Sequence, residues 1–192
     1  QRWLLRWRPA LRWRPLSTLF EAADPRLLAN PVHAFIEGGA FALFCPGGGG
    51  GRIDGLPAGA AFARVAGDAG LRAVVVRADL APDHCHQDGA LLVLGPMANA
   101  ALMALAGRSE MVVVGAGSLL MQVLALGKPS IALALAGDQR VRLAQLLAVQ
   151  AVASGGTSVA SLTVATRELW ADAERRVALH QRAQALGLRN GL

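Results

Sequence analysis

Residues 111–135, MVVVGAGSLLMQVLALGKPSIALAL, decide the fold that this sequence predicts. The apolar runs 111–115 and 130–135 are short and continuous, which is typical of strands buried on both faces of a sheet. A glycine turn and a stretch with helical spacing separate them. A strand, a helix and a second strand in this order predict neighbouring parallel strands joined by a right-handed crossover.

The same alternation runs through most of the chain. Similar apolar runs predict strands at 40–45, 72–78 and 90–95. The segments with helical spacing are 58–70, 97–109, 118–127 and 138–150. The order predicts an α/β fold with a doubly wound, mostly parallel, Rossmann-like sheet.

The end of the chain predicts one long amphipathic helix over 161–187, stopped by Gly187. Trp170, Val177 and Leu186 are expected to face inward from this helix.

Charge and composition divide the chain in two. The net charge is +6, and residues 1–14 hold five arginines and no acid, so the remainder is close to neutral. An evenly basic face is therefore not expected, and we predict no nucleic-acid partner. We expect a basic, Trp/Arg-rich segment or linker at 1–39 and a Rossmann-like domain at 40–192. The scarcity of lysine beside abundant Ala and Gly suggests a GC-rich bacterial source.

Two interpretations of the basic segment are open. Tryptophans among arginines suit a membrane surface, so residues 1–15 are candidates for contact with anionic lipid. The alternative is a linker or the remnant of an upstream domain. With no apolar run of ~20 residues and only Cys45 and Cys85, we expect a cytoplasmic protein, either free or peripheral at the inner face of the membrane.

Two glycine-rich turns follow predicted strands, where open α/β sheets bind ligands. In CPGGGGGRIDG, 45–55, consecutive glycines allow a ligand to approach the backbone, although the spacing fits neither a dinucleotide fingerprint nor a P-loop. In the second turn, Gly115 and Gly117 lead to Ser118, a candidate N-cap whose helix start would suit a phosphate. The alternatives are a flexible loop in the first case and ordinary capping with tight packing in the second.

The order of motifs in 94–139, LGPMANAALMALAGRSEMVVVGAGSLLMQVLALGKPSIALALAGDQ, extends this interpretation. A strand, a Gly/Ser turn, a helix, ALGKP, another strand and a D-Q element follow one another. This order resembles the C-terminal half of GT-B-fold glycosyltransferases, in particular the family 28-like enzymes and the related UDP-sugar hydrolases. The resemblance implies a site for a nucleotide sugar, with UDP as the expected nucleotide.

The resemblance also implies roles for individual residues. Gly117 and Ser118 would hold the diphosphate, Asp138 and Gln139 would contact the donor sugar, and Gln122 stands where many members have a Glu that binds ribose. Pro96 and Met97 would border the nucleobase. The cleft would also be lined by Gly47, Gly48, Gly49 and Gly115. Arg142 stands where an Asn is often found, and only one half of a GT-B enzyme is recognisable.

Three functions remain open at this point. The chain is expected to be the donor half of a glycosyltransferase-like protein, incomplete without an N-terminal acceptor domain. It is alternatively a non-catalytic donor-binding subunit that needs a partner chain, or a nucleotide-sugar hydrolase in which His33 activates water. The nucleotide sugar is then a substrate, and no cofactor is expected.

Residues 83–88, DHCHQD, collect His and Cys side chains that are able to bind a metal. No second ligand cluster accompanies them, so no metal site is predicted.

Overall fold

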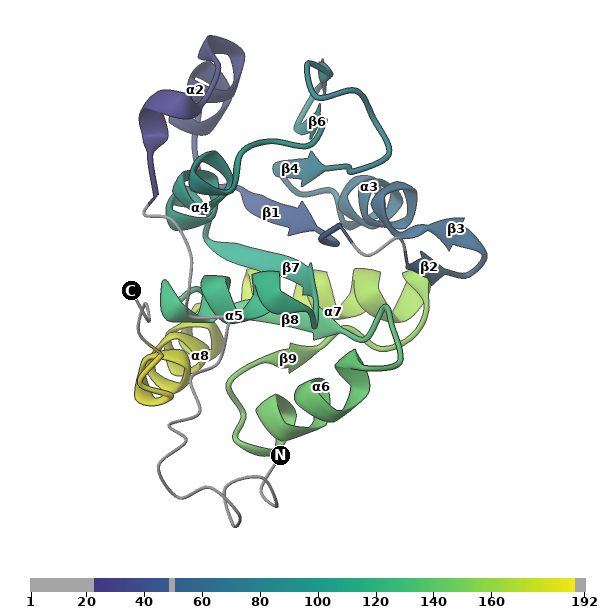
Figure 1. The fold of residues 1–192 in the computed structure, drawn as a ribbon, viewed down its shortest axis with the longest axis vertical. Coiled ribbons are helices and arrows are strands. Elements are labelled where there is room, and N and C mark those ends of the chain that lie inside the picture. The colour runs from purple at the N-terminus through teal and green to yellow at the C-terminus, as the bar shows by residue number, and fades with distance from the viewer. Residues whose placement is uncertain (1–22, 49–50, 189–192) are drawn as a thin grey trace, which may run out of the picture.

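A computed structural model describes residues 23–48 and 51–188 as an α/β sandwich around one central sheet (Figure 1). Its strand order is β5-β6-β4-β1-β7-β8-β9. The strands are β1 Ala42–Cys45, β4 Ala73–Val76, β5 Cys85–Asp88, β6 Leu91–Leu94, β7 Met111–Gly115, β8 Ser130–Leu133 and β9 Ala153–Ser154. All neighbours pair in parallel except β5 and β6. The doubly wound, mostly parallel sheet is confirmed.

Side chains alternate between two cores because successive residues of a strand point to opposite faces. Leu43 of β1 and Val112 of β7 pack against one set of helices, whereas Phe44 and Val113 pack against another. The helices are α2 Asn30–Glu37, α3 Ala58–Ala69, α4 Asn99–Arg108, α5 Ser118–Ala125, α6 Gln139–Ala148, α7 Val159–Ala171 and α8 Ala173–Ala185. Helices α2, α4 and α5 supply the first core and α3 and α7 the second, so both faces of the sheet are covered.

Four short strands of the described residues lie outside the predicted apolar runs: β2 (Arg52–Ile53), β3 (Leu56–Pro57), β5 and β9. The strands β2 and β3 form a small antiparallel hairpin after the glycine loop. Strand β5 lies within the polar stretch 83–88, where no strand was predicted, and its four residues are exposed. Backbone pairing with β6 is enough to form this strand. Because its side chains are exposed, they show no apolar pattern in the sequence.

The prediction of one long C-terminal helix is wrong. Helix α7 ends at Ala171, and Asp172 adopts φ −101° and ψ 89° before α8 begins. The Asp172 carboxylate then accepts a hydrogen bond of 2.8 Å from the Arg175 N–H, which caps the second helix. Because of this break, Val177 does not face inward as predicted and is 55% exposed. Trp170 and Leu186 pack partly against the cores, as expected.

The folded body begins before the expected boundary at residue 40. A short 3-10 helix, η2 (Pro25–Leu27), leads into α2, and Val32, Phe35 and Ile36 are buried in the same core as β1. Residues 1–15, the candidate membrane contact, lie outside the described part of the chain. Among the helices in residues 23–48 and 51–188, none has the length and apolarity to cross a bilayer.

Thr166 in α7 provides a test of the packing. Its hydroxyl is the buried side-chain oxygen that lacks a hydrogen-bond partner in the described residues. Because an unpaired buried hydroxyl costs free energy, Thr166→Val should raise the free energy of unfolding by about 1 kcal/mol in urea denaturation. Thr163→Val is the matched control, since the Thr163 hydroxyl donates to the Val159 carbonyl at 2.9 Å and its loss should bring no gain. Equal effects in the two variants would contradict this account.

Candidate functional site

Three loops meet at the carboxyl ends of β1, β7 and β8, and Gly115 lies at their meeting point. A Cβ at Gly115 would lie 2.6 Å from the Pro46 carbonyl oxygen and 2.9 Å from Leu135 Cδ1. Leu135 also lies against Gly51, where a Cβ would be 2.6 Å from Leu135 Cβ. The close approach of the backbones, rather than a special φ angle, therefore requires glycine at 115.

Helix α5 starts directly after this contact. Ser118 is its first residue, so the expectation that Ser118 is the N-cap is wrong: Gly117 holds that position and has no side chain with which to cap the helix. Ser118 is exposed. The helix start therefore presents backbone N–H groups and the positive end of its dipole at the carboxyl edge of the sheet, an arrangement that favours an anion.

Helix α6 is tied to this turn by two polar side chains. Gln139 Oε1 accepts a hydrogen bond of 2.9 Å from the Leu135 N–H, and Gln139 Nε2 is 3.4 Å from the position of a Cβ on Gly117. Arg142 donates from NH1 to the Ala116 carbonyl at 2.8 Å. Gln139 and the predicted diphosphate turn are thus brought together, and Arg142 adds a cation beside the start of α5. Asp138 is exposed next to Gln139.

A second polar link joins α4 to α5. Asn99, the first residue of α4, donates from Nδ2 to Gln122 Oε1 at 2.9 Å. Pro96 and Met97 lie partly buried in the preceding loop after β6. The predicted nucleobase and ribose positions are therefore connected through Asn99, which sequence reasoning missed. In the sequence, Asn99 is marked only as an amide side chain at the start of a predicted helix, and its partner Gln122 is 23 residues away.

The first glycine loop leaves β1 with a left-handed turn. Gly47 has φ +84°, a conformation that favours glycine, and Gly48 is exposed; Gly49 lies outside the described residues. Beyond the loop, Asp54 Oδ2 accepts a hydrogen bond of 2.8 Å from the Val159 N–H, so the hairpin is fixed to the start of α7.

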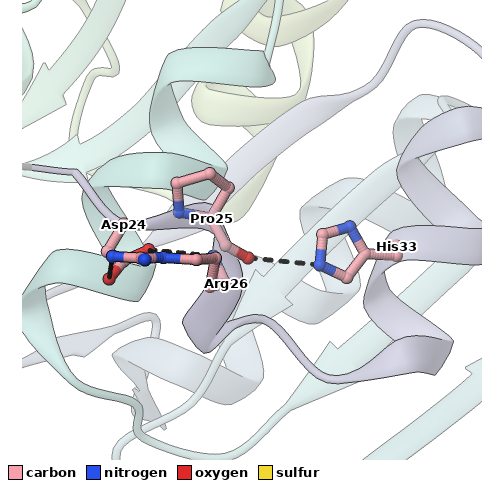
Figure 2. A network of polar contacts seen from close by, with 4 residues as sticks. All are labelled: Asp24, Pro25, Arg26 and His33. Carbon is pink, nitrogen blue, oxygen red and sulfur yellow. Dashed lines mark hydrogen bonds and ion pairs between the residues drawn. The ribbon is translucent and has the colours of Figure 1, made fainter.

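His33 has a different environment (Figure 2). Its Nε2 lies 3.1 Å from the Pro25 carbonyl oxygen, beside the Asp24–Arg26 ion pair. These contacts link α2 to η2 and include no residue of the loops around Gly115. The role of His33 as a water-activating base stays a prediction.

Solved structures with the same fold give the site its context. The chain is similar to Phytolacca americana UGT2 complexed with UDP-2fluoro-glucose and pterostilbene, at 14% identity and a TM-score of 0.58, covering 85% of this chain and 40% of that one. It is also similar to the Streptomyces sp. SF2575 glycosyltransferase SsfS6 complexed with thymidine diphosphate (16% identity, TM-score 0.53, 76% and 37%). A UDP-N-acetylglucosamine 2-epimerase matches at 14% identity and a TM-score of 0.55, with 85% and 42% coverage.

The class of fold follows from these matches. The chain has the Rossmann-like fold of one half of GT-B proteins, and the resemblance expected from residues 94–139 is confirmed for the fold. The chain spans about two fifths of the length of these structures. No known family model matches the sequence, and no curated protein matches it.

The contact at Gly115 leads to a stability prediction. A methyl group there would displace Pro46 or Leu135, so Gly115→Ala should lower the free energy of unfolding by about 1–3 kcal/mol in urea denaturation. Gly137→Ala is the control, because a Cβ at this exposed glycine of a neighbouring loop meets nothing within 4 Å. Its stability should be unchanged or slightly raised. A similar result for both variants would show that the three loops are not packed as described.

The two cysteines should differ in reactivity. Cys45 at the end of β1 is 5% exposed, and burial raises the pKa of its thiol to about 11, whereas Cys85 is exposed. At pH 8 the Cys45 thiol lies well below its pKa and stays protonated, so Ellman's reagent should modify one thiol per native chain and the second only after unfolding. Cys85→Ser should abolish the fast reaction. A fast phase that persists in this variant would contradict the burial of Cys45.

Proposed function

We propose that this chain binds a nucleotide sugar, with UDP as the nucleotide, at the loops around Gly115 and the start of α5. The observation that carries the proposal is the exposed start of α5, held against the loops of β1 and β8 by the Gly115 contact. A diphosphate placed there would accept hydrogen bonds from backbone N–H groups. The fold supports a nucleotide ligand in general, because the similar structures named above were solved with UDP-2fluoro-glucose and thymidine diphosphate.

Other contacts support the same assignment. Arg142 places a guanidinium beside the turn and fixes it through the Ala116 carbonyl. Gln122 keeps its NH₂ group for an acceptor oxygen such as a ribose hydroxyl, because its Oε1 already accepts from Asn99. In a transfer reaction, the helix start would stabilise the negative charge that develops on the departing diphosphate.

We further propose that glycosyl transfer needs an acceptor-binding half, either as another domain or as a partner chain. The proposal rests on length, since the chain covers 40% of the glycosyltransferase structure with UDP-2fluoro-glucose. The donor is the only substrate that we assign to the loops described here. Binding without turnover is therefore the expected behaviour of these 192 residues alone.

A thermal-shift titration tests the donor site. A ligand that binds only the native state at 100 times its Kd stabilises it by about 2.7 kcal/mol, which corresponds to several degrees in Tm for a domain of this size. We expect this shift with UDP and UDP-N-acetylglucosamine and a smaller one with GDP or ATP. Ser118→Trp should remove it, because the indole would occupy the space in front of the α5 N–H groups.

Gln181→Trp is the matched control, since it places an indole on the exposed face of α8 and should leave the UDP shift intact. A UDP shift that survives Ser118→Trp would move the site away from α5. No shift with any nucleotide would contradict donor binding by this chain alone.

A further inference from the structure

A pocket lies at the end of the strands opposite to the proposed nucleotide site. It has a volume of about 450 Å³ and is bordered by the segments 108–110 and 126–129 and by the first turns of α8. These two segments precede β7 and β8, so the pocket lies at the amino ends of the parallel strands. The proposed nucleotide site is at their carboxyl ends, and none of the residues discussed there lines this pocket.

The charged side chains of the lining are mostly cationic. The lining holds three cations, Arg108, Lys128 and Arg176, one carboxylate, Glu110, and the imidazole of His180. Lys128 is the only lysine of the chain. Its ammonium is half-buried, and this burial lowers its pKa, although Glu110 acts in the opposite direction. The pocket therefore holds more positive charge than its own acid neutralises.

Backbone carbonyls hold three of these groups in place. Lys128 Nζ donates to the Ser109 carbonyl at 2.9 Å, and His180 Nδ1 is 2.6 Å from the Gly127 carbonyl oxygen. Arg176 donates from NH1 to the carbonyls of Leu169, at 2.9 Å, and Trp170. Each of these bonds fixes a side chain at the end of a helix. A structural role therefore accounts for one N–H donor of each side chain.

These structural contacts do not account for the remaining N–H donors of the cations. An ammonium has three N–H groups and a guanidinium five, so Lys128 and Arg176 retain donors after these bonds are counted. Arg108, in the last turn of α4, is exposed at the rim. A tetrahedral oxyanion with several acceptor oxygens matches this set of cations better than a planar or apolar ligand.

We propose that this pocket binds a phosphate group, separately from the nucleotide site. The ligand is inorganic phosphate or a small molecule that carries a phosphate, or the headgroup of a phospholipid. All three present the same oxyanion to Arg108, Lys128 and Arg176.

The test uses the full chain and inorganic phosphate, titrated calorimetrically against sodium chloride at equal ionic strength. Arg108→Gln and Lys128→Gln should each weaken phosphate binding at least tenfold. Arg108→Gln removes an exposed charge and leaves the helix contacts intact, so the test does not depend on the stability of the Lys128 variant. Arg64→Gln removes an exposed cation of α3, outside the pocket, and should have no effect.

Ser118→Trp distinguishes this pocket from the proposed nucleotide site, since phosphate binding at the pocket should persist in this variant. Loss of phosphate binding in Ser118→Trp, or unchanged affinity in both Arg108→Gln and Lys128→Gln, would overturn the proposal. Equal heats with phosphate and chloride would overturn it as well.

Vesicles distinguish the sources of the phosphate. A lipid headgroup would be identified by two results together. The chain would sediment with phosphatidylglycerol vesicles but not with phosphatidylcholine vesicles, and Arg108→Gln and Lys128→Gln would reduce this sedimentation. Binding of free phosphate with no effect of these variants on sedimentation would identify a soluble ligand.

Discussion

Burial of the central sheet on both faces is the constraint on which the rest of the structure depends. Strands β1, β4, β7 and β8 are buried at every position, and their one hydroxyl, that of Ser130, donates to the Lys128 carbonyl. A polar side chain in these strands therefore needs a hydrogen-bond partner inside the protein. Polar chemistry is therefore confined to the two edges where strands begin and end. Both sites proposed here follow from this: one at the carboxyl ends, built from backbone N–H groups, and one at the amino ends, built from side-chain cations.

The same constraint explains which parts of the fold were predictable. Continuous apolar runs such as 73–76 and 111–115 have few alternatives to a buried strand, and the five strands predicted from such runs are present. Strand β5 was missed because backbone pairing with β6 is enough to form it, and its sequence CHQD carries no apolar pattern. The break at Asp172 left a fainter signal, an N-cap residue with Glu174 in the following turn, inside an otherwise periodic stretch.

The candidate site was predictable only where the chain itself dictates geometry. Glycines after strands indicated the turns at Gly47 and Gly115, because close backbone approach excludes most other residues. The bond between Asn99 and Gln122 depends on how two helices are placed side by side, and the bond from Arg142 to Ala116 depends on the position of α6. Neither spacing nor composition contains that information. Arg142, which stands where the resembling glycosyltransferases often have an Asn, has a structural partner in the Ala116 carbonyl.

Helix α6 contributes little to the core, since Leu146 is its one buried residue. Its position relative to the β7–α5 turn depends on the hydrogen bonds of Gln139 and Arg142 together with the partly buried side chains of Leu143 and Leu147. Segments with few apolar contacts open locally at a lower free energy than the strands beneath them. In hydrogen exchange, the amides of α6 would exchange through local opening, whereas those of β7 would exchange only through global unfolding. A ligand that contacts both the turn and α6 would suppress that fluctuation, so the protection of the α6 amides would report its binding.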